Sequence, residues 1–343
     1  MRHAVCLLAL ASSASASIYA ENFEVNPAAA WTINGGPSDE TANFFFDYST
    51  VGIPPAPSGA GTRGMKLQAN LSNGIFGGFS VSPTGLNISG DFTLSFDWWA
   101  NFNGPFPSGG SGAVNLSTFG VGTAGITPQW PGGIQDSVWF AATGDGNSAS
   151  DWRAYSSAAP VGYTSGNAVY AAASTNHTDP YYAQFGLNTA PAPQLLLYPQ
   201  QTGVTNVGSA GLEWHQVEIA SIGNTITWTV DGLLIATINR ATVTLGGGNI
   251  FFGHSDVNAT SSTDPNDAAL LFTLIDNIRV EAAPACPGDV NGDGSTDAGD
   301  FVILAGNFGA PVPANTAGDL NGDGVVDAAD FVILAGDFGC TGP

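Results

Sequence analysis

The sequence predicts a mainly β protein, in which an antiparallel β-sandwich precedes a small α-helical unit. Segments of alternating polar and apolar residues recur between residues 21 and 283, as expected of strands with one buried face. The 46 glycines suit short strands joined by turns. A segment with a different pattern occurs twice after residue 286. We therefore place the sandwich at residues 21–283 and the second domain at residues 284–343.

The composition excludes several functional classes. The 343 residues include 28 acidic and 6 basic side chains, for a formal net charge of −22. Such a surface repels phosphate backbones and anionic lipid, which excludes nucleic-acid and peripheral-membrane roles. The hydrophobic content of 43% is enough for a packed core and excludes wholesale disorder.

Residues 1–20 have the layout of a secretory signal peptide, with an apolar run at residues 4–11 and a small-residue stretch after it. Cleavage could follow either Ala16 or Ala20. The alternative is a membrane anchor, but the apolar run is too short to span a bilayer. No other segment approaches transmembrane length, so we expect an exported protein that is secreted or held at the cell surface.

Two cysteines remain after the signal, Cys286 and Cys340, and they bracket nearly the whole C-terminal segment. An even pair in an oxidising compartment usually forms a disulfide, although two free thiols are the alternative. Closing a loop of this length stabilises the fold by roughly 4 kcal/mol in the chain-entropy treatment.

The C-terminal segment repeats itself, since residues 288–309 and 318–339 are identical at 17 of 22 aligned positions. Each copy begins with a ladder of Asp and Asn at positions 1, 3, 5, 9 and 12, counted from its first aspartate. The ladder residues are Asp289, Asn291, Asp293, Asp297 and Asp300 in the first copy, and Asp319, Asn321, Asp323, Asp327 and Asp330 in the second.

This spacing is typical of a twelve-residue EF-hand-type calcium loop. Alternate residues of a tight loop direct oxygens at one centre, and Ca²⁺ is a hard cation that prefers oxygen ligands. Position 7, Ser295 or Val325, would supply a backbone carbonyl, while Gly294 and Gly324 permit the sharp turn. Position 12 is Asp where Glu is common, so the following helix must approach the ion closely. The sequence therefore predicts two calcium ions.

The charge of this segment supports the calcium prediction. From Cys286 onward there are nine aspartates and no Lys or Arg. Without cations the clustered carboxylates would repel one another and the loops should open. The alternative is a solvated acidic tail, which would not require a doubled ladder with glycine at position 6.

A short helix should follow each loop, because apolar residues there are spaced i, i+3, i+4 and i+7. Gly309 and Gly339 should end the helices. Two prolines flank Cys286 and leave no room for a helix before the first loop. Each unit is then a loop followed by one helix. The spaced residues are Phe301, Leu304, Ala305 and Phe308, then Phe331, Leu334, Ala335 and Phe338.

Residues 286–343 resemble a type I dockerin, with two tandem loop–helix calcium repeats and Asp at position 12. The resemblance implies one Ca²⁺ per loop, helices paired about a pseudo-twofold axis, a cohesin-type partner and a role in polysaccharide breakdown. Cellulosomal dockerins carry hydroxyl and basic residues after the ladder, where this chain has Ala298-Gly299 and Ala328-Ala329. The apolar helices could instead contact the chain's own sandwich, another copy or a different partner.

Four segments of the larger domain predict strands. Residues 91–102 alternate strictly and residues 212–220 less cleanly. Residues 226–230 alternate with threonines before a hairpin turn at Asp231-Gly232. Residues 270–280 would form a closing strand.

Residues 213–232, EWHQVEIASIGNTITWTVDG, resemble the laminin-G/concanavalin-like jelly roll of lectins and glucanases. The closing DNIRV, residues 276–280, is similar to the last strand of such modules in bacterial surface proteins. The resemblance implies a jelly-roll β-sandwich. This fold hosts lectins, adhesins and hydrolases, so the function must come from the site.

The sequence favours a protein that is not an enzyme. Jelly-roll glucanases use the pattern E-x-D-x-x-E, which does not occur here. Glu213 and Glu218 would point to opposite faces of a strand, whereas glycoside hydrolysis needs two carboxyls flanking one bond. We expect structural or surface roles for His177, His215 and His254. The rival prediction is a glycoside hydrolase acting on O-glycosyl bonds through aspartates from distant strands.

Aromatic residues near acids suggest carbohydrate binding, because flat rings stack on sugars. Trp99 lies at a polar position of its strand, and further aromatics occupy residues 143–186 near Asp145 and Asp151. The alternative is ordinary packing. Asp256 and Asn258 could bind a third cation, although turns favour the same residues. The candidate sugar-binding residues are Trp99, Trp152, Tyr155, Tyr181 and Tyr182.

Together these observations predict an exported calcium-binding protein. Its jelly-roll module would bind a polysaccharide or cell-surface glycan, and its dockerin-like module would tether it. The alternatives are a component of polysaccharide degradation with hydrolase activity and a structural extracellular protein.

Overall fold

A computed structural model of the chain shows two compact units, Ile18–Val280 and a segment that begins at Glu281. None of the described helices is long and apolar enough to cross a membrane. The predicted cleavage position at Ala16 and the candidate cation ligand Asn258 lie outside the described residues. These are residues 17–35, 39–69, 71–72, 74–110, 112, 114–157, 162–257, 260–262, 264–283, 286–313 and 316–341.

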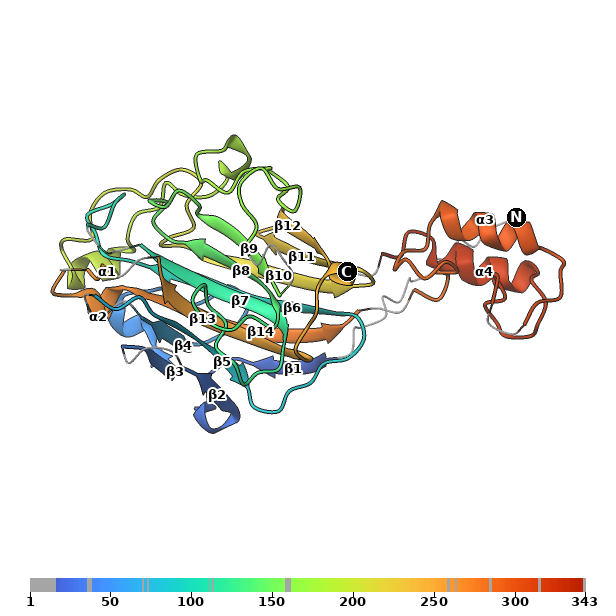
Figure 1. Ribbon diagram of the computed structural model, residues 1–343, viewed down its shortest axis with the longest axis horizontal. Helices are drawn as coiled ribbons and strands as arrows, with labels where there is room; N and C mark the ends of the chain where they lie inside the picture. The colour runs from blue at the N-terminus through green and yellow to red at the C-terminus, as the bar shows by residue number, and fades with distance from the viewer. Residues whose placement is uncertain are drawn as a thin grey trace, which may run out of the picture. The chain divides into compact units, whose positions relative to one another are not determined.

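The larger unit is a sandwich of two antiparallel sheets (Figure 1). Its larger sheet has the strand order β12-β11-β10-β6-β14-β4-β3, and β1 also pairs with β14. The strands are β1 Ser17–Glu21, β3 Thr41–Asp47, β4 Arg63–Gln68, β6 Phe92–Asn101, β10 Trp214–Ile222, β11 Thr225–Val230, β12 Leu233–Asn239 and β14 Phe272–Ala282.

The smaller sheet has the order β2-β5-β13-β7-β8-β9. Two short helices, α1 Ala192–Leu197 and α2 Asp267–Leu270, lie in the connections. The strands are β2 Trp31–Asn34, β5 Gly78–Pro83, β7 Asn115–Thr123, β8 Val138–Thr143, β9 Trp152–Ser156 and β13 Asn249–Asp256.

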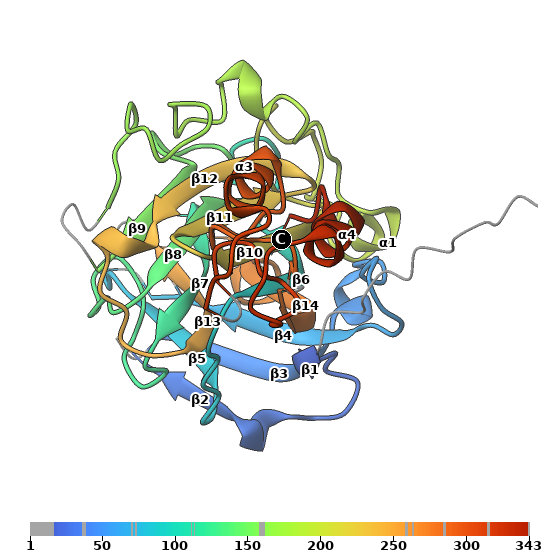
Figure 2. The same ribbon diagram turned by 90° about the vertical axis from the view of Figure 1, so that its right-hand side faces the viewer.

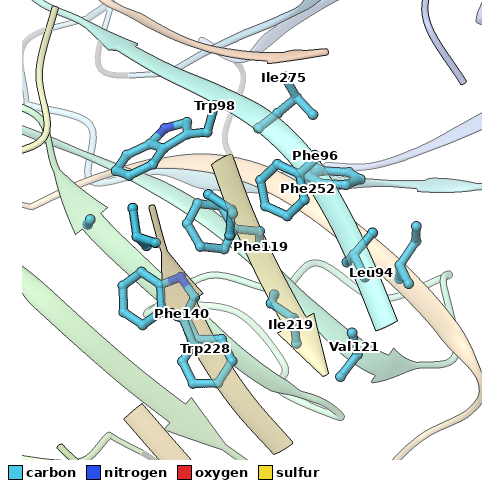
Figure 3. Close-up of a cluster of buried hydrophobic side chains, with 14 of the residues drawn as sticks. Leu94, Phe96, Trp98, Phe119, Val121, Phe140, Ile219, Trp228, Phe252 and Ile275 are labelled. Carbon is cyan, nitrogen blue, oxygen red and sulfur yellow. The ribbon is translucent and has the colours of Figure 1, made fainter. Parts of the chain in front are cut away.

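Aromatic side chains from both sheets fill the space between them (Figure 3). The ring of Phe96 lies 5.2 Å from that of Phe119 and 4.9 Å from that of Phe252. Trp228 lies 5.0 Å from Phe140. Truncating one such buried aromatic to Ala typically costs about 3–5 kcal/mol, so this cluster is a large part of what holds the sheets together.

The predicted sandwich and its strands are confirmed. Strands β6, β10 and β14 occupy the expected segments, and positive φ angles at Asp231 and Gly232 form the tight turn between β11 and β12.

The prediction that β6 exposes one polar face is wrong for its second half. Trp99, Asp97 and Asn101 are all buried. A second hydrophobic cluster covers this part of the outer face, since loop residues pack there against the sheet. Its members include Tyr48, Val51, Ile53, Trp99, Phe102, Phe106, Leu212, Phe272 and Leu274.

The smaller unit contains the two predicted helices, α3 Ala298–Asn307 and α4 Ala328–Asp337, which lie side by side (Figure 2). Its core has three buried apolar residues, Leu304, Val326 and Leu334. The expected four-residue apolar face is only partly buried, because the narrow contact between ten-residue helices covers one leucine from each. Phe301 is 43% exposed and Phe308 is 56% exposed.

We expect the exported chain to begin at Ser17. Cleavage after Ala16 leaves β1 whole, whereas cleavage after Ala20 removes four of its five residues and the contact of Tyr19 with the core. Intact-mass measurement of the exported protein checks this, and an N-terminus at Glu21 would contradict it. Deleting residues 17–20 should lower the melting temperature by a few degrees, since each lost kcal/mol shifts it by about 2–4 °C.

Candidate functional site

The first acidic loop is curled around the carboxylate of Asp289. Its two oxygens accept hydrogen bonds from the backbone N–H groups of Gly292, at 2.7 Å, and Gly294, at 2.8 Å. Both glycines have positive φ angles, 74° and 90°, which other residues rarely adopt. The amide oxygen of Asn291 accepts from the N–H of Asp293 at 2.8 Å. The glycine at position 6 is therefore needed where the sequence places it.

The carboxylate at position 12 closes the loop from the helix side. Asp300 is buried at the start of α3, and its Oδ1 accepts from the N–H groups of Val290, at 2.7 Å, and Asn291, at 2.9 Å. Its Oδ2 accepts from the N–H of Asp297 at 2.8 Å. Asp297 in turn caps the helix. The short Asp side chain therefore brings the helix close to the loop.

The second loop repeats this arrangement around Asp330, which is also buried. Burial raises the pKa of Asp330, but hydrogen bonds from backbone N–H groups outweigh it and hold the pKa below its usual range. Those donors are the N–H groups of Asp327, Asn321 and Leu320.

Both loops offer a hard cation a set of oxygens. A carboxylate has about four lone-pair sites, so its oxygens can accept from backbone N–H groups and still bind a metal. No basic side chain lies within residues 286–313 or 316–341 to neutralise them. The residues that could hold an ion are Asp289, Asn291, Asp293, Ser295, Asp297 and Asp300, then Asp319, Asn321, Asp323, Val325, Asp327 and Asp330, with Ser295 and Val325 acting through backbone carbonyls.

Each repeat is held by the other. The N–H of Thr296 donates to the carbonyl of Cys340 at 2.7 Å, and the N–H of Gly309 donates to the carbonyl of Val326, also at 2.7 Å. A disulfide joins Cys286 and Cys340, whose Cα atoms are 5.8 Å apart. The loops, helix ends and disulfide thus form one connected structure.

A polar groove lies on the outer face of the larger sheet. It has a volume of about 400 Å³ and crosses β11, β10, β6 and β14. Thr229, Glu218 and Ser95 are direct cross-strand neighbours and form one row of it. The other lining residues are Ser58, Phe96, Gln216, Val217, Gly232, Asn277 and Arg279.

A buried carboxylate positions the groove wall. Asp97 accepts from the Ser58 hydroxyl at 2.7 Å, the Ser58 N–H at 3.0 Å and the Asn277 amide at 2.8 Å. The Ser58 hydroxyl also accepts from the amide of Gln216 at 2.9 Å. The wall is therefore organised before any ligand arrives.

A second pocket of about 380 Å³ shares Asn277 and Arg279 with the groove, so the two adjoin. On the same sheet face, half-buried Trp214 donates its indole N–H to the carbonyl of Pro54 at 2.8 Å. It lines a third pocket of about 390 Å³ together with Glu213.

The predicted sugar-stacking role is wrong for Trp99, Trp152 and Tyr182. Their exposed fractions are 2%, 1% and 0%, so none can offer a ring face to a sugar. Trp152 and Tyr182 belong to the main hydrophobic core, and Trp99 belongs to the second hydrophobic cluster. The half-buried Tyr155 stacks on Trp139, with ring centroids 3.9 Å apart.

The remaining residues that the sequence analysis singled out in the sandwich bond to neighbouring groups of the protein. The hydroxyl of the half-buried Tyr181, a candidate sugar-binding residue, donates to the carbonyl of Leu234 at 2.7 Å. The carboxylate of Asp151 lies 2.8 Å from Nδ1 of His177. Burial raises the pKa of Asp145 to about 7. Burial also lowers the pKa of His254 to about 3.

Sequence reasoning missed the groove residues Ser58, Ser95, Thr229 and Arg279. The alternation in residues 212–220 places Trp214, Gln216 and Glu218 on one face of a strand. This pattern could have indicated that the face carries a polar binding surface. Which strands flank that face is decided by the topology, which the pattern does not contain.

Residues 287–338 match the family model for the dockerin type I domain. The C-terminal unit is a type I dockerin domain, joined to a jelly-roll-like sandwich. No curated protein matches the chain.

Solved structures similar to the chain include the Bacillus licheniformis beta-glucanase, at 13% identity and a TM-score of 0.39, with 78% of this chain and 99% of that one covered. Another is the carbohydrate binding module CBM66 from Bacillus subtilis, at 8% identity, a TM-score of 0.34 and coverage of 74% and 96%. A third comes from work on endo-acting O-glycanases of the human gut microbiota, at 12% identity, a TM-score of 0.42 and coverage of 78% and 100%.

Removing calcium should unfold the dockerin and spare the sandwich, because only the dockerin depends on acidic loops around a three-residue core. Limited proteolysis in excess EDTA, followed by reduction and mass spectrometry, should show cleavage after residue 286. All eight tryptophans lie in the sandwich, so their fluorescence should not change. Resistance of residues 286–341 in EDTA would contradict the prediction.

Asp319→Ala should remove one bound calcium ion relative to the parent chain, since it removes an oxygen at position 1 of one loop. Asp289→Ala should remove the other. Glu218→Gln, an exposed change in the sandwich, is the control and should keep the parental stoichiometry in calorimetry. An unchanged count in both loop variants would refute the ligand assignment.

Proposed function

We propose that this chain is an exported, non-catalytic glycan-binding protein whose calcium-loaded dockerin attaches it to a cohesin-type partner. The observation that carries the proposal is a pre-organised polar groove with a single lining carboxylate, in a chain that ends in a dockerin domain. The predicted signal peptide supports export.

The two acidic loops support calcium binding by the dockerin. Each provides five side-chain donors and one backbone carbonyl, within the six to eight oxygens that Ca²⁺ takes. The nine aspartates of the domain are also a reason for the fold to require cations.

Apolar side chains on the helices support attachment to a partner. Both helices expose residues that a globular core would bury, and the two sets occupy equivalent positions of the two repeats. Such patches often mark protein interfaces. Because the domain has no basic side chain, we expect the partner to carry basic groups around an apolar centre. The exposed residues are Phe301, Val302, Phe308, Phe331, Val332 and Phe338.

The groove supports glycan binding. Hydroxyl, amide, carboxylate and guanidinium groups line it, and each can hydrogen-bond to sugar hydroxyls. Hydrolysis would need a second carboxyl opposite Glu218. The residues that line the groove include no second carboxyl. Glu21 lines the adjoining pocket instead, and its Oε1 accepts a hydrogen bond from the N–H of Phe23 at 2.8 Å. Glycan binding therefore fits the groove better than hydrolysis.

Glu218→Gln and Arg279→Ala should each weaken glycan binding about tenfold, the effect of losing one charged hydrogen bond of roughly 1.4 kcal/mol. Affinity electrophoresis against a panel of soluble polysaccharides measures this. Arg240→Gln, which changes a half-buried arginine outside the groove, should leave binding unchanged. Silence of the folded parent chain across the panel would favour a structural role. Release of reducing sugar that Glu21→Gln abolishes would establish the hydrolase instead.

Phe301→Ala combined with Phe331→Ala should reduce capture of the full chain on an immobilised cohesin domain at least tenfold, because both repeats lose an exposed ring. Leu196→Ala, at a position 84% exposed on the sandwich, is the matched control. Surface plasmon resonance with and without EDTA provides the readout. Undiminished capture by the double variant would exclude the helix faces as the contact.

A further inference from the structure

The polar groove on the larger sheet contains two opposite charges that do not pair with each other. Glu218 lies on β10 and Arg279 on β14, and both side chains are exposed. Strand β6 runs between the two strands, so their backbones are about 10 Å apart at the usual strand spacing of roughly 4.8 Å. No acid or base of the described residues forms an ion pair with either side chain. Both charges are therefore free to meet a ligand.

Arg279 is held more weakly than any other Lys or Arg side chain of the described residues. Its guanidinium donates to the carbonyl of Ser58 at 3.4 Å, which is a long hydrogen bond. Each of the others pairs with an acid or donates a hydrogen bond of 3.0 Å or less. These others are Lys66, Arg63, Arg153 and Arg240. A guanidinium has five N–H donors, so Arg279 keeps most of them for a ligand.

Arg279 also lies between two carboxylates. It lines both the groove, which contains Glu218, and the adjoining pocket, which contains Glu21. Either glutamate would repel an anionic group of a ligand, so within these two pockets such a group binds at Arg279. A cationic group binds best at Glu218, because Glu21 already accepts a hydrogen bond from the N–H of Phe23.

The charges decide which kind of glycan fits. A polysaccharide with acidic groups alone is repelled by the net charge of −22 and by Glu218. One with amino groups alone places an ammonium against Arg279, and a neutral one leaves both side chains without a counter-charge. A glycan that carries both an ammonium and a carboxylate matches both side chains and is not repelled as a whole.

The rest of the groove favours a glycan over a peptide of the same charges. The hydroxyl side chains of Ser95 and Thr229 stand in one row with Glu218, and hydroxyls can donate to and accept from the hydroxyls of a sugar. Strands β6 and β10 each have a neighbouring strand on both sides. An extended peptide therefore cannot add to the sheet at the groove as a further strand.

We propose that the groove selects a zwitterionic glycan, in which a free amino sugar binds Glu218 and an acidic sugar binds Arg279. This inference rests on the proposed glycan binding and adds the charges of the ligand to it. Both contacts are charge-assisted hydrogen bonds, which are stronger than those between neutral groups. The hydroxyl row between them then contacts the uncharged part of the sugars.

Four oligosaccharides with the same glucosamine backbone test the proposal on the full chain. Chitin oligosaccharide is neutral, chitosan carries ammonium groups, carboxymethyl chitin carries carboxylates, and carboxymethyl chitosan carries both. Calorimetry is done in slightly acidic buffer with calcium, so that the amines are protonated. The parent chain should bind carboxymethyl chitosan about tenfold more tightly than chitin, and more tightly than either probe of single charge.

Two substitutions assign each charge of the ligand to its residue. Glu218→Gln should remove the gain in affinity that the amine gives and keep the gain from the carboxylate, while Arg279→Gln should do the reverse. Glu213→Gln, at an exposed position outside the groove, and Arg240→Gln change the same charges elsewhere and should keep both gains. Tryptophan fluorescence confirms that each variant is folded.

Equal affinity of the parent chain for all four probes, or a gain that survives the substitution of its residue, would overturn the proposal. Tighter binding of a lysine–aspartate peptide than of any probe would show that the ligand is a peptide. If the chain binds only neutral polysaccharides, the charge assignment is wrong and glycan binding stands. If it binds no glycan at all, both proposals are wrong.

Discussion

Carboxylates outnumber basic side chains by 28 to 6 in this chain, so most buried acids need partners other than lysine or arginine. Asp97 is satisfied by a serine and an asparagine, and these contacts shape the groove. Asp300 and Asp330 are satisfied by backbone N–H groups, and these contacts shape the acidic loops. The same constraint thus gives rise to both candidate sites.

The two units differ in what stabilises them against the cost of burying acidic side chains. The sandwich has an extended aromatic core that remains stable while several acids lie buried within it. The dockerin has three buried apolar residues and depends on its disulfide and, in our proposal, on its cations. One chain therefore combines a part that is stable by packing with a part that is stable by cross-links.

The sequence predicted what depends on local spacing. The ladder, the helices after it and the turn at Asp231 are local patterns, and the structure contains each helix and the turn. The prediction for Trp99 was wrong because loop residues cover that face of its strand. An alternating pattern shows on which face of a strand a residue lies, but not what packs against that face. The groove depended on β10 lying between β11 and β6, an arrangement set by long-range pairing.

The reciprocal pairing of the dockerin repeats has a consequence for their origin. A single thirty-residue copy would leave its loop exit and helix end unpaired, and two separate copies could satisfy each other only as a symmetric homodimer. Duplication within one polypeptide makes that association intramolecular. Folding then no longer depends on protein concentration.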